Sequence, residues 1–339
     1  MSIRSITRAL AGLGLCAAAL TATAGPYSNL VVFGDSLSDS GNNALLLSNF
    51  GTQPLPPVVI ASDASYSRIP SAAMTYSNGK VWTQYLAQSL GLTLTPSLAG
   101  GTNFSFGGAQ TGIDGNDVPQ IPGFPFSMRT QLNTYLGATG GIADPNALYI
   151  VAGGGNNIRA ALEAIAAGAD PNATAAATVA GYATDMAGLV ANLKIAGAHH
   201  VLVLNTPNFG LTPLANALGV STLATNLSYA MDAQLATALQ GSGVQTFDLF
   251  SFLSGVVAAG PASGFSNLTH ACAAVVNACD VNTSLFWDGI HPTTLAHQQL
   301  AAAVLAVAVP EPEVAGMLAL GLAIVALSVR RRRAGGQQG

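Results

Sequence analysis

The chain has 339 residues, half of them hydrophobic and only 8% charged, with a formal net charge of −4. Its central part, residues 25–309, carries 5 basic and 13 acidic residues. This part has no basic cluster for nucleic-acid phosphates, so nucleic-acid binding is not expected.

Residues 1–24 have the pattern of a secretory signal peptide. Arg4 and Arg8 form its basic region, residues 9–20 are apolar, and Ala22-Thr23-Ala24 fits the small-residue cleavage rule. We therefore expect an exported protein that starts at Gly25 and works in the periplasm, at the cell surface or outside the cell.

A short apolar run, residues 30–34, predicts a buried strand that stops at Gly34-Asp35-Ser36. Ligands of open α/β sheets bind at the carboxyl ends of the strands, which is where this turn would place the Ser36 hydroxyl. Asp and Ser also cap helices, so this motif alone is compatible with either a nucleophile or a cap.

Strands and helices then alternate along the chain. Further strands are predicted at residues 102–105, 147–151, 200–204 and 244–247. Helices are predicted at residues 80–90, 172–196, 213–239 and 293–307. This order predicts an α/β fold with a parallel sheet covered by helices on both faces. Two long loops, residues 51–74 and 111–126, follow the first two strand ends and are expected to wall a substrate cleft.

Two glycine-rich turns follow the second and third predicted strands. The first contains Gly107 and Gly108, and the second reads Gly153-Gly154-Gly155-Asn156-Asn157. Glycine lets the backbone approach a ligand closely, and Asn156 adds an amide donor. A phosphate site is the alternative for such turns, but the dinucleotide and P-loop spacings are absent, so a nucleotide cofactor is not expected.

Asp288 and His291 stand three residues apart in the last predicted loop. A carboxylate on imidazole Nδ1 would leave Nε2 free to take a serine proton. The same spacing is common in ordinary turns, so the pair gains meaning only together with Ser36.

Three cysteines are present, and Cys16 leaves with the signal peptide. Cys272 and Cys279 remain as an even pair in an oxidising compartment, which predicts a disulfide, with two free thiols as the alternative. We expect no metal site here because these thiols lack partners at ligand spacing.

Taken in order, Ser36, Gly108, Asn156 and His291 match the four blocks of the GDSL esterase/lipase family, also called SGNH hydrolases, and the chain resembles this family from residue 30 to residue 305. The resemblance implies a three-layer α/β/α, flavodoxin-like fold with five parallel strands and a cofactor-free ester hydrolase. Asn157 departs from the family, which usually has Asp after the third-block Asn, so the way this loop is held is open.

The resemblance also implies the residue roles. Ser36 would be the nucleophile, His291 the base and Asp288 the group that orients it, while Ser36, Gly108 and Asn156 would form the oxyanion hole. The expected substrate is a small-molecule or lipid acyl ester. Two alternatives stay open, a carbohydrate (acetyl) esterase acting on exopolysaccharide and a non-catalytic surface or matrix binding protein.

An apolar run of 16 residues, 314–329, precedes four arginines, 330–333, near the C-terminus. It predicts a short membrane helix with a cytoplasmic tail, with a buried core helix as the alternative. Together with Pro310-Glu311-Pro312 it resembles the PEP-CTERM sorting signal, which implies transient anchoring in the inner membrane and removal by an exosortase-type enzyme. The expected layout is a signal peptide (1–24), a hydrolase domain (25–309) and a sorting segment (310–339).

Overall fold

The computed structural model describes residues 26–48, 59–277 and 279–309. The predicted signal peptide, sorting motif and C-terminal membrane helix lie outside the described residues. Within these three ranges, no helix has both the length and the apolar character needed to cross a membrane.

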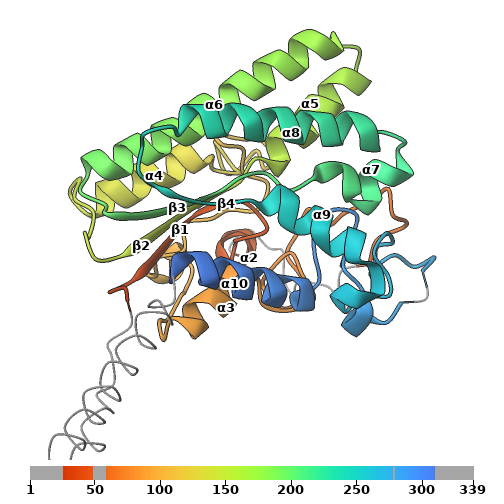
Figure 1. Cartoon of the computed structure of the whole chain (residues 1–339), viewed down its shortest axis with the longest axis horizontal. Coiled ribbons are helices and arrows are strands. Elements are labelled where there is room, and N and C mark those ends of the chain that lie inside the picture. The colour runs from red at the N-terminus through yellow and green to blue at the C-terminus, as the bar shows by residue number, and fades with distance from the viewer. Residues whose placement is uncertain (1–25, 49–58, 278, 310–339) are drawn as a thin grey trace, which may run out of the picture.

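The centre of the molecule is a parallel sheet with the strand order β1-β2-β3-β4 (Figure 1). Leu30 pairs with Leu148, and Leu148 pairs in turn with His200. The strands are β1 (Leu30–Gly34), β2 (Leu148–Ala152), β3 (His200–Leu204) and β4 (Gln245–Phe247). The predicted parallel α/β fold is confirmed.

The expected fifth strand, residues 102–105, is not formed, so the sheet described here has four strands. This segment lies beside β1 and bonds to it through Val32, whose N–H donates to Thr102 O at 3.0 Å and whose carbonyl accepts Phe104 N–H at 2.8 Å. The pairing forms only one isolated parallel bridge, between Asn103 and Val32. The Asn42 side-chain amide donates to the carbonyl oxygens of both Asn103 and Ser105, at 2.7 and 3.0 Å. These two carbonyl oxygens therefore bind the first residue of α2 (Asn42–Ser48) rather than a neighbouring strand.

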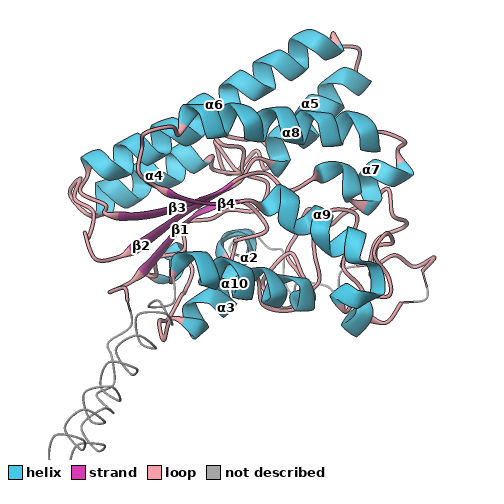
Figure 2. Cartoon of the chain, viewed as in Figure 1, coloured by secondary structure: helices cyan, strands magenta, loops and turns pink. Residues whose placement is uncertain are grey.

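Alternating strand residues sort into two cores. Val31 and Phe33 pack with one set of helices, whereas Leu30 and Val32 pack with the other. The first face is covered by α4 (Met128–Ala138), α5 (Gly155–Ala166), α6 (Pro171–Ile195) and α8 (Ser221–Ala238). The second is covered mainly by α3 (Trp82–Ser89) and α10 (Thr294–Ala308). Figure 2 shows the resulting three layers.

The predicted helix at 213–239 is two helices, because Gly219 adopts a left-handed φ of 68° between them. The helices α2, α4, α5 and α9 were not predicted from the sequence. The remaining helices are α2 (Asn42–Ser48), α7 (Pro213–Ala217) and α9 (Leu249–Ala259), with 3-10 turns at Ser97–Ala99, Phe209–Leu211, Gly260–Ser263 and Val281–Thr283.

Candidate active site

Ser36, His291 and Asp288 form one hydrogen-bonded series at the carboxyl edge of the sheet. Ser36 Oγ lies 2.9 Å from His291 Nε2, and His291 Nδ1 lies 2.8 Å from Asp288 Oδ2. Their exposed fractions are only 7, 3 and 1%. Ser36 follows β1 and the other two precede α10, so the fold joins groups 255 residues apart in the chain.

Asp288 is held by donors on both oxygens. Its Oδ1 accepts the N–H groups of Ile290 and His291 at 2.9 and 2.8 Å, and its Oδ2 also accepts the N–H of Ser67 at 2.9 Å. A carboxylate in this position presents only acceptors to the imidazole, so the ring proton lies on Nδ1. His291 Nε2 is then an acceptor facing the Ser36 hydroxyl.

The turn that carries Gly108 requires glycine. Gly108 has a φ of 86°, and an added Cβ would lie 2.7 Å from Pro125 Cγ. Across the part of the chain that the structure describes, neither the N–H of Ser36 nor that of Gly108 has a hydrogen-bond acceptor within the protein. Both N–H groups are therefore free to donate to a ligand.

Asp39 and Asn43 fix this glycine turn. Gly107 N–H donates to Asp39 Oδ2 at 3.2 Å and to Asn43 Oδ1 at 3.1 Å, and the Asn43 amide returns a bond to Gly107 O at 2.9 Å. Burial raises the pKa of Asp39 to about 6, against four backbone N–H groups that favour its charged form. The segment that follows Ser36 thus holds the Gly107-Gly108 turn in place.

Asn156 lies in the first turn of α5 and lines the same pocket as Ser36. Its Nδ2 donates to Ala109 O at 3.0 Å, and its Oδ1 accepts from Arg159 Nε at 3.3 Å. One of the two Nδ2 hydrogens remains for a ligand. The structure therefore brings all the residues predicted for catalysis and for the oxyanion hole to one place.

Asn157, the departure from the family pattern, is well bonded. Its Oδ1 accepts Thr111 N–H at 3.2 Å, and its Nδ2 donates to Thr111 Oγ1 at 3.0 Å. The Thr111 hydroxyl in turn donates to Asp185 Oδ2 at 2.9 Å. The amide thus supplies a donor that a carboxylate would lack.

We expect Asn157→Asp, although it restores the usual family residue, to lower the free energy of unfolding by about 1–3 kcal/mol at pH 7. Two carboxylates would then face Thr111 Oγ1, which has one proton and already gives it to Asp185. Urea unfolding at pH 7 and at lower pH measures the effect, and the deficit should shrink as the new acid is protonated. Asn172→Asp, at an exposed helix start, is the matched control. Unchanged or increased stability of Asn157→Asp would contradict this account.

A pocket of about 300 Å³ opens beside Ser36. Both loops that were expected to wall the cleft contribute to it, through Arg68 and Ile69 from the first and Val118 and Phe124 from the second. Its other wall residues include Asn43, Leu47, Tyr66, Tyr76, Asp117, Asn156 and Arg159. A smaller apolar pocket of about 50 Å³ is also lined by Ser36 and includes Leu253 and Phe286.

Several residues that support Ser36, His291 and Asp288 were not predicted from the sequence. Tyr76 packs its ring 5.2 Å from that of His291, and its hydroxyl contacts the Asn43 amide at 2.6 Å. Burial also raises the pKa of Asp35 to about 6 and lowers that of His297 to about 3, which keeps His297 neutral behind the site. The polar residues Asp39 and Asn43, which closely follow Gly34-Asp35-Ser36, were a usable signal. Nothing local marked Ser67 or Tyr76.

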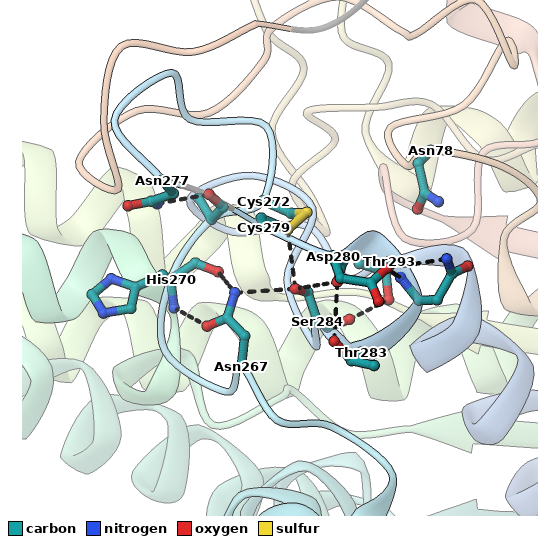
Figure 3. The surroundings of a disulfide bond; sticks show 12 residues. Asn78, Asn267, His270, Cys272, Asn277, Cys279, Asp280, Thr283, Ser284 and Thr293 are labelled. Atoms are coloured by element: carbon teal, nitrogen blue, oxygen red, sulfur yellow. Dashed lines mark hydrogen bonds between the residues drawn. A yellow bond between two sulfur atoms is a disulfide. The ribbon is translucent and has the colours of Figure 1, made fainter.

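The predicted disulfide joins Cys272 and Cys279 (Figure 3). The segment it closes pairs with the residues just before Asp288, since Cys272 N–H donates to Phe286 O at 3.1 Å and Ala273 N–H to Trp287 O at 2.7 Å. The bridge therefore supports the segment that leads into the loop of Asp288 and His291.

Replacing both cysteines by alanine should lower the free energy of unfolding by about 2 kcal/mol, since the closed loop is short, and kcat should fall several-fold. The physical reason for the second effect is the loss of support for Asp288. Thermal unfolding and ester hydrolysis, each with and without reductant, provide the measurement, and the double variant controls for side effects of the reductant. Unchanged stability and activity after complete reduction would contradict it.

The described ranges hold no group of three or more His, Cys, Asp or Glu side chains arranged to bind a metal ion. The arrangement that is present, a serine, an imidazole and a carboxylate in series beside free backbone donors, is the one that serine hydrolases use for acyl transfer.

The model of the GDSL-like Lipase/Acylhydrolase family matches residues 30–304, and the chain belongs to this family of ester hydrolases. It is 32% identical to Lipase 1 of Photorhabdus luminescens over 55% of this chain and 23% of that protein. It is 26% identical to a GDSL esterase/lipase of Arabidopsis thaliana over 82% of this chain and 88% of that protein. It is 29% identical to Esterase EstA of Pseudomonas aeruginosa over 81% of this chain and 46% of that protein. The chain thus spans less than half the length of both bacterial relatives.

Proposed function

We propose that this protein is an exported serine esterase or lipase that cleaves acyl esters with Ser36, His291 and Asp288. The observation that carries the proposal is the 2.9 Å contact between Ser36 Oγ and His291 Nε2 at the wall of an open pocket. Distances of this size are what proton transfer from a nucleophile to its base needs.

In the proposed reaction, Ser36 Oγ attacks the ester carbonyl carbon while His291 Nε2 takes the hydroxyl proton. Asp288 stabilises the imidazolium that forms, and the oxyanion is met by the N–H groups of Ser36 and Gly108 and by Asn156 Nδ2. His291 then gives the proton to the departing alcohol, which leaves an acyl-enzyme on Ser36. Water, deprotonated by His291, attacks the acyl-enzyme and releases the acid and the free Ser36 hydroxyl.

A carbohydrate esterase that removes acetyl groups from exopolysaccharide is the second candidate. The polar part of the larger pocket, formed by Asn43, Ser67, Arg68, Asp117 and Arg159, favours it because a sugar presents many hydroxyl groups. A non-catalytic surface or matrix binding protein is the third candidate, and membership in a family of ester hydrolases argues against it.

The experiment that separates these candidates is a substrate profile of the purified protein. Activity on p-nitrophenyl esters of several chain lengths, exceeding that on acetylated sugars, is the result expected of an acyl esterase. Preference for acetylated sugars would favour the second candidate. If neither class of ester is hydrolysed, the proposed function is wrong.

We further propose, from the sequence alone, that residues 1–24 and 310–339 are removed after export, the second by an exosortase-type enzyme. The intact mass of the protein isolated from its native source measures this. The measured mass should match a chain that begins at Gly25 and lacks the four arginines 330–333. A mature protein that retains both ends would rule out the layout.

A further inference from the structure

Arg159 lies one helical turn after Asn156 on α5, and its side chain is only 14% exposed. Because side chains on a helix point back toward its N-terminus, the guanidinium reaches the level of Asn156. There Nε donates to Asn156 Oδ1 at 3.3 Å, and Nη1 donates to Glu163 Oε1 at 2.8 Å. The guanidinium also lies 5.9 Å from the Tyr66 ring.

Helix stability does not explain this residue. A cation brought near the N-terminus of a helix opposes the helix dipole. An arginine four residues before a glutamate is also the less favourable order for such a pair. Positions that break local preferences in this way are expected to be functional or strained ones.

The contact with Asn156 has a directional consequence. An amide turned by 180° would place Nδ2 against the Arg159 donor and Oδ1 against the Ala109 carbonyl oxygen. A donor would then face a donor and an acceptor would face an acceptor, whereas the observed orientation gives each group of the amide a hydrogen-bond partner. Arg159 and Ala109 O together fix the orientation of the Asn156 amide, and Asn156 lines the pocket beside Ser36.

We infer that Arg159 is a positioning residue for the oxyanion hole, which fixes the side-chain amide of Asn156 and polarises it as a donor. The inference rests on the proposed function, because it assigns a task within that reaction. Since the oxyanion exists only along the reaction path, the loss of Arg159 affects kcat and leaves KM largely unchanged.

Three substitutions separate the donor from the charge. Arg159→Met keeps the length of the side chain up to Nε but removes both donor and charge. Arg159→Gln places an amide nitrogen where Nε lies and removes the charge together with the Nη1 donor to Glu163, whereas Arg159→Lys keeps the charge and places a methylene at the Nε position. We expect kcat to fall about tenfold in the Met and Lys variants, with KM changed less than about threefold, and to recover largely in the Gln variant.

A double-mutant cycle with Asn156→Ala completes the test. Asn156→Ala alone should lower kcat by roughly 10²–10³-fold, and Arg159→Met should add nothing in that background, because the amide it positions is gone. Glu163→Gln retains an acceptor for Arg159 Nη1 and serves as the control, with kcat near that of the wild type.

The inference is overturned if Arg159→Met keeps a wild-type kcat, or if its effect persists in full in the Asn156→Ala background. It is also overturned if Arg159→Gln is as impaired as Arg159→Met, because the donor position would then not matter. These outcomes require an active wild-type protein. A wild type without esterase activity would instead refute the proposed function itself.

Discussion

Ser36→Ala should lower kcat/KM for a p-nitrophenyl acyl ester by about 10⁴-fold or more. In the proposed mechanism the Ser36 side chain supplies the oxygen that attacks the ester, and no other hydroxyl lies in contact with His291 Nε2 among the described residues. The fold should persist, because the Ser36 hydroxyl makes a single hydrogen bond whose loss is worth only about 1 kcal/mol. Initial rates and a circular-dichroism melt measure both parts.

Ser251→Ala is the matched control for this variant, because Ser251 lies exposed on α9 and outside both pockets around Ser36. It should hydrolyse the ester at the wild-type rate. An active Ser36→Ala protein would remove the nucleophile from the proposed mechanism.

Asp288→Asn should lower kcat by about 10⁴-fold, through the tautomer of His291 rather than through loss of the site. An amide NH₂ facing Nδ1 would donate to the ring, so the ring proton would move to Nε2. Nε2 would then donate to Ser36 Oγ and could no longer take its proton. The side-chain NH₂ would also face Ser67 N–H, which could then no longer donate to this position. Because that hydrogen bond is lost, we expect the free energy of unfolding to fall by about 1–3 kcal/mol.

Steady-state kinetics well below the melting temperature separate these two effects. Asp170→Asn is the control, because Asp170 caps α6 through Ala173 N–H and Asn caps equally well. If Asp288→Asn lost activity only in proportion to its unfolded fraction, Asp288 would be a structural residue.

The sequence was most informative where local pattern and chemistry coincide. Strand β1 is an apolar run that ends at Gly34, two residues before Ser36, and β2 and β3 are likewise followed by a glycine or a polar residue, so their shared edge could be predicted. Asp288 and His291 could be paired because they share one turn. These features depend on residues close together in the chain.

Long-range contacts account for what was missed. Residues 102–105 have the composition of a strand, but the Asn42 amide takes up two of their carbonyls from 61 and 63 residues away. Ser67 donates to Asp288 across 221 residues, and Tyr76 packs on His291 from the same loop region. A single sequence carries no sign of such pairings, because each partner alone looks like an ordinary loop residue.

The departure at Asn157 is explained by the same kind of contact. Its amide both accepts from and donates to Thr111, whose hydroxyl serves Asp185. An aspartate at this position could not donate to the Thr111 hydroxyl. The loop next to Asn156 is therefore held by hydrogen bonds of a neutral side-chain amide.

The most direct test of the central claim is covalent labelling of the intact protein with a fluorophosphonate, which reacts with an activated serine. We expect one adduct per molecule, which peptide mass spectrometry locates on Ser36, and no adduct in His291→Ala. A folded protein that hydrolyses esters but is labelled at another serine, or is not labelled at all, would contradict the assignment of Ser36 as the nucleophile.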